Sequence, residues 1–266
     1  SSKATSLANQ ALNEWRRWQA PFQTQPEIVD QLEGGLTNAT FLIESDAQRA
    51  VLRINNPEAH KLGVNRQTDI IILEKLQSTG LVPKLYFANS SYLVCEYING
   101  VALDDDKATN PVVKKQIEQA IDVIQKQDFT DLAVRNYESY LREYCNQISP
   151  NYLHETTRQS LLQIARDIDA QNWQPVLCHH DLIPENIIMD ARGLIFIDWE
   201  YASLGHPQFD YQRLLNSHHF MDIPANKCGL QALQAIMIQL WYAIRYPELQ
   251  EDIKKELNKI IETVNL

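Results

Sequence analysis

Three polar side chains, Asp181, Asn186 and Asp198, stand at fixed separations among short runs of apolar, β-forming residues. Residues 187–189 and 194–197 are predicted as two strands, and the Gly-containing turn between them predicts an antiparallel hairpin. Asn186 precedes the first strand and Asp198 ends the second. The hairpin should therefore bring an amide and a carboxylate together.

An amide oxygen beside a carboxylate suits a hard cation such as Mg²⁺, which accepts one or two protein ligands together with phosphates. Asp181 lies in the loop before the hairpin, where a carboxylate could orient a hydroxyl or accept its proton. Each residue alone is better explained as a loop cap or a turn residue. Together, in the order base, metal amide and metal carboxylate, they indicate phosphoryl transfer.

The motifs around these residues resemble those of the choline kinase and aminoglycoside phosphotransferase superfamily. The matching segments are residues 179–181, Asn186, 197–203 and 209–210. The Asp-Trp-Glu-Tyr-Ala run resembles the choline and thiamine kinase branch more than the antibiotic-resistance branch. His180 is a departure, because the family usually has Gly or Asn there.

The resemblance implies roles for individual residues. Asp181 would be the catalytic base, and Asn186 and Asp198 would hold Mg²⁺ against the phosphates of ATP. Asp210 would brace the catalytic loop without contacting substrate.

A turn that begins with Gly34 and Gly35 separates two predicted strands near the N-terminus. Glycine allows the backbone to approach a ligand closely, and Thr37 and Asn38 could donate hydrogen bonds to phosphate oxygens. A plain hairpin turn would explain the pattern on its own. The run is similar, however, to the Gly-Gly-Leu-Thr-Asn phosphate loop of choline kinase-like proteins.

Arg53, in a predicted strand, matches the strand cation that contacts nucleotide phosphates in this fold, although an exposed strand residue is the simpler interpretation. By the same match, Asp69 occupies the helical position where a Glu normally pairs with that cation. Glu96, Tyr97 and Ile98 correspond to the hinge, whose backbone would bind adenine.

Four residues are candidates for binding a cationic substrate. Glu200 could face that cation or join the metal shell through water, and Tyr201 matches a tyrosine of the choline pocket. Trp241 and Tyr242 lie on a predicted buried helix over residues 230–246. Aromatic faces bind quaternary ammonium groups well, but core packing explains these two residues equally well.

The predicted fold class is α+β, with the two lobes of a protein kinase-like fold. An N-terminal nucleotide-binding lobe, residues 1–98, would contain an antiparallel sheet, one helix within the lobe and a leading amphipathic helix over residues 4–19. A mainly helical C-terminal lobe, residues 99–266, would carry the catalytic and substrate-binding groups.

The composition, with 266 residues and 44% hydrophobic content, is ordinary for a globular protein. The net charge of −10 argues against a nucleic-acid-binding surface and suits a cationic substrate, although it also favours solubility. No apolar run is long enough to span a membrane. No signal-peptide pattern is present and the cysteines are scattered, so we expect a cytoplasmic protein, either monomer or homodimer.

The sequence therefore predicts a kinase that transfers the γ-phosphoryl group of ATP to a hydroxyl, with choline or a related amino alcohol as the leading substrate. Thiamine and an aminoglycoside are the alternatives. A non-catalytic nucleotide-binding module is a further alternative, and the intact set Asp181, Asn186 and Asp198 argues against it.

Overall fold

The computed structural model describes residues 2–32, 38–215 and 229–265, which form two compact units. The first contains Ser1–Ile124 and Glu185–Ala202, and the second contains Gln125–Pro184 and Ser203–Leu266. The predicted hairpin thus belongs with the N-terminal part of the chain. The predicted division into lobes at residue 98 stays a prediction.

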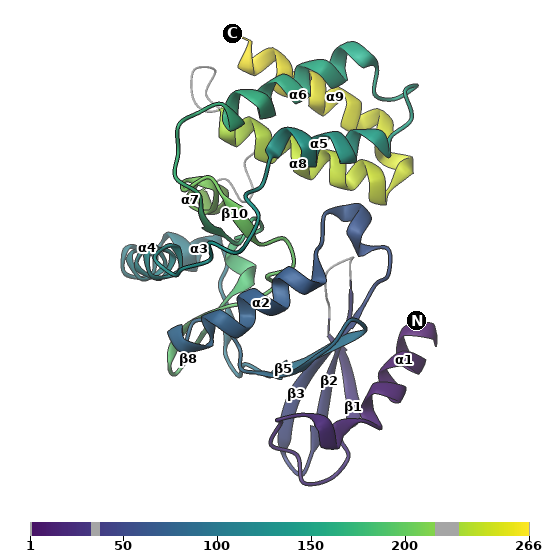
Figure 1. Ribbon diagram of the computed structural model, residues 1–266, viewed down its shortest axis with the longest axis vertical. Coiled ribbons are helices and arrows are strands. Elements are labelled where there is room, and N and C mark those ends of the chain that lie inside the picture. Colours follow the sequence, from purple (N-terminus) through teal and green to yellow (C-terminus); the bar gives the residue numbers. More distant parts are fainter. Residues whose placement is uncertain (1, 33–37, 216–228, 266) are drawn as a thin grey trace. The chain divides into compact units, whose positions relative to one another are not determined.

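The first unit is built on a five-stranded antiparallel sheet in the order β1-β2-β3-β5-β4 (Figure 1). Its strands are β1 (Glu27–Leu32), β2 (Asn38–Ser45), β3 (Gln48–Asn55), β4 (Leu85–Ala88) and β5 (Tyr92–Glu96). In β3, Ala50, Leu52 and Ile54 lie on one face of the sheet and are buried. They share a hydrophobic core with Ala8 and Ala11 of helix α1 (Ser2–Leu12).

The leading helix is shorter than the predicted span of residues 4–19. It ends at Leu12, a 3₁₀ turn η1 (Trp15–Arg17) follows, and Trp18 is extended. The buried Trp18 donates its indole N–H to Tyr92 Oη at 3.1 Å and packs edge-on against Phe22. Burial of this large ring in the core of the sheet outweighs the local helical preference.

Helix α2 (Arg66–Leu76) begins after Asn65, which caps it by accepting the backbone N–H groups of Gln67 and Thr68. Short 3₁₀ turns, η2 (Ala59–Leu62) and η3 (Gln77–Thr79), flank the helix. Its buried side includes Asp69 as well as apolar residues.

The predicted hairpin is present as β8 (Ile187–Asp190) and β9 (Gly193–Phe196). It follows the 3₁₀ turn η4 (Pro184–Asn186), and β8 also pairs with β6 (Val101–Ala102) to complete a three-stranded sheet. Helices α3 (Asp105–Thr109) and α4 (Pro111–Gln125) come after β6 in the chain.

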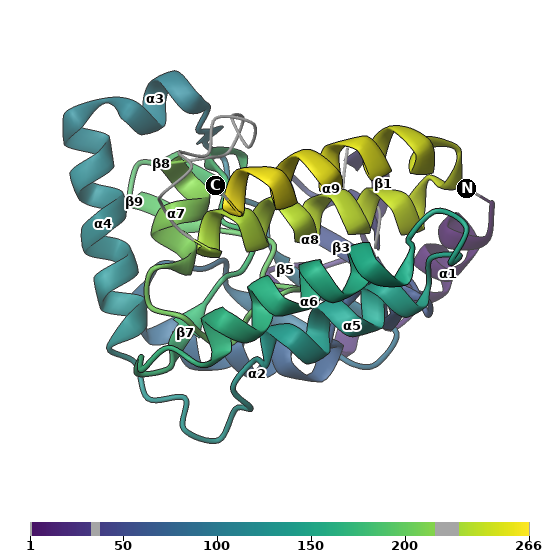
Figure 2. The ribbon, with the colours of Figure 1, turned by 90° about the horizontal axis from the view of Figure 1, so that it is seen from above.

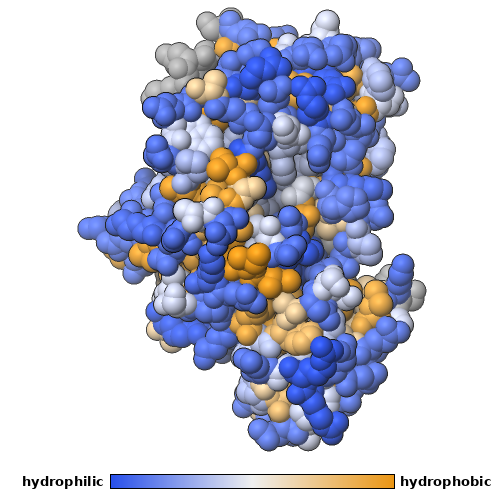
Figure 3. Space-filling view, in the orientation of Figure 1, coloured by the Kyte–Doolittle hydropathy of each residue, from blue (hydrophilic) through white to orange (hydrophobic). Residues whose placement is uncertain are grey.

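Helices α5, α6, α8 and α9 of the second unit pack side by side around one core (Figure 2). The elements of this unit are α5 (Tyr137–Asn146), α6 (Glu155–Asp169), β7 (Val176–Cys178), β10 (Ser203–Gly205), α7 (Phe209–Leu215), α8 (Gly229–Arg245), η5 (Pro247–Leu249) and α9 (Gln250–Val264). The outward surface of α6 and α9 is mostly hydrophilic, as amphipathic helices require (Figure 3).

The predicted α+β fold class is confirmed, with an antiparallel sheet in one unit and helices dominating the other. Helix α8 is buried mainly over residues 230–236, in its first half, in keeping with its apolar sequence. None of the helices in the described ranges is both long and apolar enough to cross a bilayer.

The helical core should be sensitive to cavities. Leu141 is fully buried on α5, whereas Leu249 of η5 is 39% exposed. We expect Leu141→Ala to lower the free energy of unfolding by about 2–5 kcal/mol, because a buried cavity forms. The matched change Leu249→Ala should cost less than about 1 kcal/mol. Urea denaturation measures both, and equal losses would contradict this assignment of the core.

Candidate functional site

A cavity of about 210 Å³ lies within the first unit. Its apolar lining comes from the sheet and from the hairpin, through Leu32, Val51, Leu93, Ile188 and Ile197. The predicted hinge residues Glu96, Tyr97 and Ile98 line the same cavity. An apolar slot bordered by backbone of a hinge segment can hold a heteroaromatic base.

Polar and charged side chains line the rest of this cavity. They are Asn38, Thr40, Arg53, Asp198 and Glu200. Gly34, Gly35 and Thr37, predicted to contact phosphate, lie outside the described residues. Asn38, the remaining member of that set, is the first residue of β2.

Arg53 and Asp69 form a buried ion pair, with Arg53 Nη2 lying 3.1 Å from Asp69 Oδ2. A second guanidinium, that of Arg66, lies 3.2 Å from the same oxygen and 3.3 Å from Glu200 Oε2. Asn38 donates to Glu200 Oε2 at 2.7 Å and accepts a hydrogen bond from Arg66. Two cations and two carboxylates therefore form one connected network.

Sequence analysis missed Arg66. The available signal was its position three residues before Asp69 on the same helix, where side chains face each other. Burial raises the pKa of Asp69 and lowers that of Arg66, while their mutual attraction opposes both shifts. Each charge is thus sustained by its partner.

Glu200 was predicted to face a cationic substrate. Its carboxylate instead contacts Arg66 and Asn38 within the first unit. Its charge is therefore already balanced by a guanidinium, so a substrate cation would have to share it. The substrate contact stays a prediction.

The register of the hairpin brings its two ends together as predicted. Ile187 pairs with Phe196, and the N–H of Ile197 donates to the carbonyl of Asn186 at 2.9 Å, so Asn186 lies beside the residue that precedes Asp198. Asn186 is buried, and Asp198 adopts a left-handed backbone with φ of 60°. Such a conformation in a non-glycine residue is held only when surrounding structure determines it.

Asp198 faces the cavity and keeps solvent-accessible surface there, yet protein atoms crowd it closely. Burial, reinforced by the negative charge of Glu200, raises the pKa of Asp198 to about 6, while Arg53 and Arg66 oppose the shift. A divalent cation would favour the ionised form of this carboxylate. The donor set of an amide oxygen and a carboxylate therefore fits Mg²⁺.

The loop that carries Asp181 lies in the second unit and is held by Asp210, in the first turn of α7. Asp210 accepts the backbone N–H groups of His179 at 2.7 Å and His180 at 3.1 Å. The predicted bracing role is thus confirmed by two hydrogen bonds. Burial raises the pKa of Asp210 to about 6, and these hydrogen bonds favour its ionised form.

Asp181 itself is partly exposed. Its backbone N–H donates to His179 Nδ1 at 3.2 Å, and its Oδ1 lies 3.7 Å from the guanidinium of Arg213. Sequence analysis missed Arg213 as well, although it lies three residues after Asp210 on α7 and so on the same side of the helix. The contact gives Asp181 a cationic neighbour.

The aromatic candidates lie in both units. Tyr201 is half-buried in the first unit. On α8, Trp241 packs against the helical core and meets Tyr242 edge-on, with ring centroids 5.3 Å apart. Tyr242 is 43% exposed and stacks on Tyr246 at 6.1 Å. Core packing therefore explains Trp241 in part and Tyr242 poorly.

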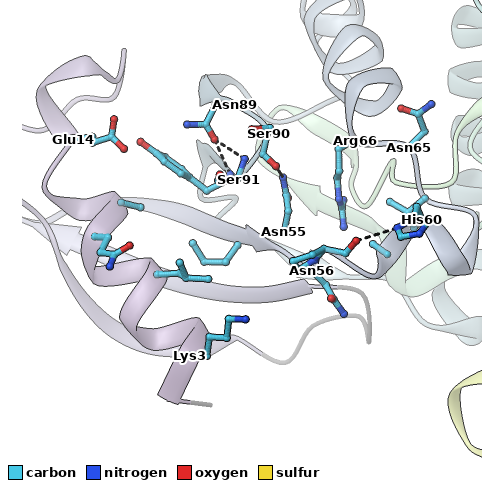
Figure 4. Close-up of a pocket in the computed structure, with 18 residues that line it drawn as sticks. Lys3, Glu14, Asn55, Asn56, His60, Asn65, Arg66, Asn89, Ser90 and Ser91 are labelled. Atoms are coloured by element: carbon cyan, nitrogen blue, oxygen red, sulfur yellow. Dashed lines mark hydrogen bonds between the residues drawn. The ribbon is translucent and has the colours of Figure 1, made fainter.

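A second cavity, of about 800 Å³, opens beside α1 in the first unit (Figure 4). Lys3 of α1 and Glu14, just after that helix, line one side, and Asn56, His60 and Arg66 line the other. Asn38 and Glu200, which both contact Arg66, line the hinge cavity. Arg66 therefore lies in the wall between the two cavities.

A strand cation paired with a helical acid, a hinge-lined cavity and an Asn/Asp hairpin define the class as a protein kinase-like phosphotransferase. Solved structures agree on the fold. The choline kinase LicA from Streptococcus pneumoniae aligns over 97% of this chain and 99% of its own, with a TM-score of 0.69 and 18% identity. A LicA structure in complex with AMP gives a TM-score of 0.72 and 20% identity over 97% and 98%.

The family model for choline/ethanolamine kinase matches residues 29–265, so the chain belongs to that family. Protein LicA of Haemophilus influenzae is 25% identical over 74% of this chain, and mouse Ethanolamine kinase 2 is 27% identical over 88%. The chain spans 60% and 67% of the length of these two relatives. The predicted family is confirmed, together with the enzyme class of that family, a phosphotransferase with an alcohol acceptor.

Removing Arg66 should destabilise the sheet unit, because Asp69 and Glu200 would lose a shared cation. We expect Arg66→Met to cost about 3–5 kcal/mol at neutral pH. The loss should shrink towards pH 5, since Asp69, whose pKa is already raised, can then bind a proton. Arg49→Met is the control, because Arg49 pairs with Glu44 at the surface and should contribute less than about 1 kcal/mol. Thermal unfolding at both pH values measures this, and a pH-independent loss would contradict it.

Proposed function

We propose that this chain is an ATP-dependent kinase that transfers the γ-phosphoryl group to the hydroxyl of choline or a closely related amino alcohol. The observation that carries the proposal is the hairpin register, which brings the ends at Asn186 and Asp198 together beside a cavity that Arg53 also lines. Membership of the choline/ethanolamine kinase family supports the reaction, and the AMP complex of LicA supports an adenine nucleotide.

In this proposal the hinge cavity holds the nucleotide. Adenine lies against the apolar lining and the backbone of Glu96, Tyr97 and Ile98, and the phosphates lie towards Arg53 and Asn38. Asp69 binds no ligand itself, but its ion pair fixes the Arg53 guanidinium. Gly34, Gly35 and Thr37 would add backbone and hydroxyl donors to the phosphates.

Asn186 and Asp198 would hold Mg²⁺, which when bound neutralises phosphate charge. The raised pKa of Asp198 supports this role, because a carboxylate crowded by protein atoms and lying near Glu200 gains from a cation. Arg53 supplies fixed positive charge within the same cavity. Since phosphoryl transfer asks little covalent chemistry of the protein, these charges would account for much of the rate.

Asp181 would accept the proton of the acceptor hydroxyl as that oxygen bonds to the γ-phosphorus. The bond from phosphorus to the bridging oxygen breaks, giving ADP and a phosphomonoester. Asp210 holds the backbone of His179 and His180, and His179 Nδ1 accepts the backbone N–H of Asp181. The guanidinium of Arg213 lies 3.7 Å from the Asp181 carboxylate.

A quaternary ammonium has no N–H to donate, so its recognition depends on aromatic faces and negative charge. Tyr201, Tyr242 and Trp241 are the proposed aromatic contacts, and Glu200 is the proposed acidic one. The ring of Tyr242 is exposed, which favours a role in substrate binding over a role in core packing. Ethanolamine, which needs hydrogen-bond acceptors, and thiamine, another cation with a primary hydroxyl, are the competing substrates.

Two substitutions should separate the base from the metal ligand. Asp181→Asn should lower kcat about 10²–10⁴-fold while nucleotide affinity stays unchanged. Asp198→Asn should abolish transfer and remove the Mg²⁺ dependence of nucleotide binding.

In the unaltered protein, Mg²⁺-dependent nucleotide binding should strengthen as pH rises through about 6, because Asp198 must lose its proton. Calorimetry with a non-hydrolysable ATP analogue measures affinity, and near-normal turnover of Asp181→Asn would refute the base.

The substrate is tested with a panel of choline, ethanolamine, thiamine and kanamycin at saturating Mg²⁺-ATP. We expect the highest kcat/KM with choline, and Tyr242→Leu should raise the KM for choline about tenfold through loss of cation–π attraction. Tyr152→Leu, also at an exposed tyrosine, is the control and should leave KM unchanged. A higher kcat/KM with another acceptor would show that choline is not the preferred substrate. ATP binding without turnover on any acceptor would favour a non-catalytic module.

A further inference from the structure

His180, directly before Asp181, has a left-handed backbone with φ of 66°. Glycine and asparagine adopt this conformation readily, whereas a bulkier side chain adopts it only under constraint. The choline kinase-like motif usually has Gly or Asn at this position. Position 180 thus has the left-handed backbone that Gly or Asn adopts readily, but in this chain the residue there is a histidine.

The imidazole is 6% exposed and contacts a polar group at each ring nitrogen. Its Nε2 lies 2.9 Å from Tyr137 Oη, and its Nδ1 lies 3.2 Å from Ser203 Oγ. Phe209 meets the ring edge-on at 4.5 Å and stacks on Tyr137 at 5.7 Å. Tyr137, Ser203 and Phe209 thus clamp the ring from three elements, α5, β10 and α7.

The donors and acceptors around the ring favour one tautomer. Tyr137 Oη accepts the backbone N–H of His206 at 3.1 Å, which leaves its own proton to donate to His180 Nε2. Burial raises the pKa of the Tyr137 phenol well above its usual value, so the phenol keeps that proton. The ring proton then lies on Nδ1 and is donated to Ser203 Oγ, which donates to the carbonyl of Leu204 at 3.3 Å.

The fold makes room for this clamp. A Cβ at Gly205 would come within 2.5 Å of Tyr137 Oη and 2.7 Å of His180 Nε2, which real structures do not allow. Glycine at position 205 therefore permits the Tyr137–His180 contact. The backbone at His180, the absence of a side chain at Gly205 and two hydrogen bonds together hold the imidazole in one position.

We propose that His180 is a positioning residue, whose imidazole, clamped between Tyr137 and Ser203 as the Nδ1–H tautomer, fixes the left-handed turn that orients the Asp181 carboxylate. The proposal rests on the proposed function, in which Asp181 accepts the proton of the substrate. In the motif, Gly or Asn permits the left-handed turn through its backbone freedom. In this chain, contacts of the His180 side chain would stabilise the same turn.

The decisive variant is Tyr137→Phe, because it removes the hydroxyl but keeps the ring that stacks on Phe209. We expect kcat to fall about tenfold through misorientation of Asp181, with KM for ATP within about twofold of its original value. Tyr144→Phe is the matched control. It removes a buried hydroxyl from the same helix, one that pairs with Tyr140, and should leave kcat unchanged.

A double-mutant cycle tests whether Tyr137 acts through the imidazole. His180→Ala removes the clamp and leaves a residue that adopts the left-handed backbone less readily than Gly or Asn, so it should lower kcat at least as much as Tyr137→Phe. Adding Tyr137→Phe to His180→Ala should then cost nothing further. Multiplicative losses, or a lower Tm in Tyr137→Phe with unchanged kcat, would overturn the positioning role.

A measurement without turnover separates this inference from the proposed function. Nitrogen NMR of the full chain with labelled histidine should show the His180 imidazole neutral with its proton on Nδ1, and Tyr137→Phe should change the Nε2 signal. Tyr144→Phe should leave that signal in place. A proton on Nε2, or no response to Tyr137→Phe, would refute the clamp even in an active kinase. If the protein is inactive but gives the expected spectrum, the proposed kinase function is refuted and the His180 clamp is not.

Discussion

The conformation of the Asp181 loop depends on one buried carboxylate. Asp210 accepts two consecutive backbone N–H groups, from His179 and His180, and this pair of hydrogen bonds holds a turn that contains a strained left-handed residue. Desolvation opposes the charge of Asp210, whereas the two donors favour it. The ordered loop and the charge of Asp210 thus stabilise each other, which couples the geometry of the loop to the packing of α7.

The first unit follows the same physical rule with more charges. Arg53 and Arg66 share Asp69, and Arg66 also contacts Glu200, so each buried charge has a partner of opposite sign. Removal of one member leaves others uncompensated, which is more costly than removal of the whole network. The cavity lined by Arg53, Asp198 and Glu200 therefore carries charges of both signs, which phosphates and a cation would perturb together.

Much of the fold could be predicted from local sequence. The hairpin over residues 187–197 was predicted from β-forming runs around a turn, and β8 and β9 confirm it. The leading helix was predicted too long, because burial of Trp18 against Tyr92 is a tertiary effect. Of the candidate site, Asn186 and Asp198 could be paired because hairpin register is local. Arg66 and Arg213 could not be chosen, since many surface arginines share their spacing to an acid.

The sequence by itself determined which chemical groups the protein presents: an amide and a carboxylate at the two ends of one hairpin, and an aspartate in the loop before it. Those assignments depend on residue type and short-range geometry, which the chain encodes directly. Tertiary structure alone decided which long-range partners hold the groups, such as Arg66 for Glu200 and Tyr137 for His180, residues separated by 134 and 43 positions. Contacts at such separations follow from packing of whole elements, and no local pattern specifies them.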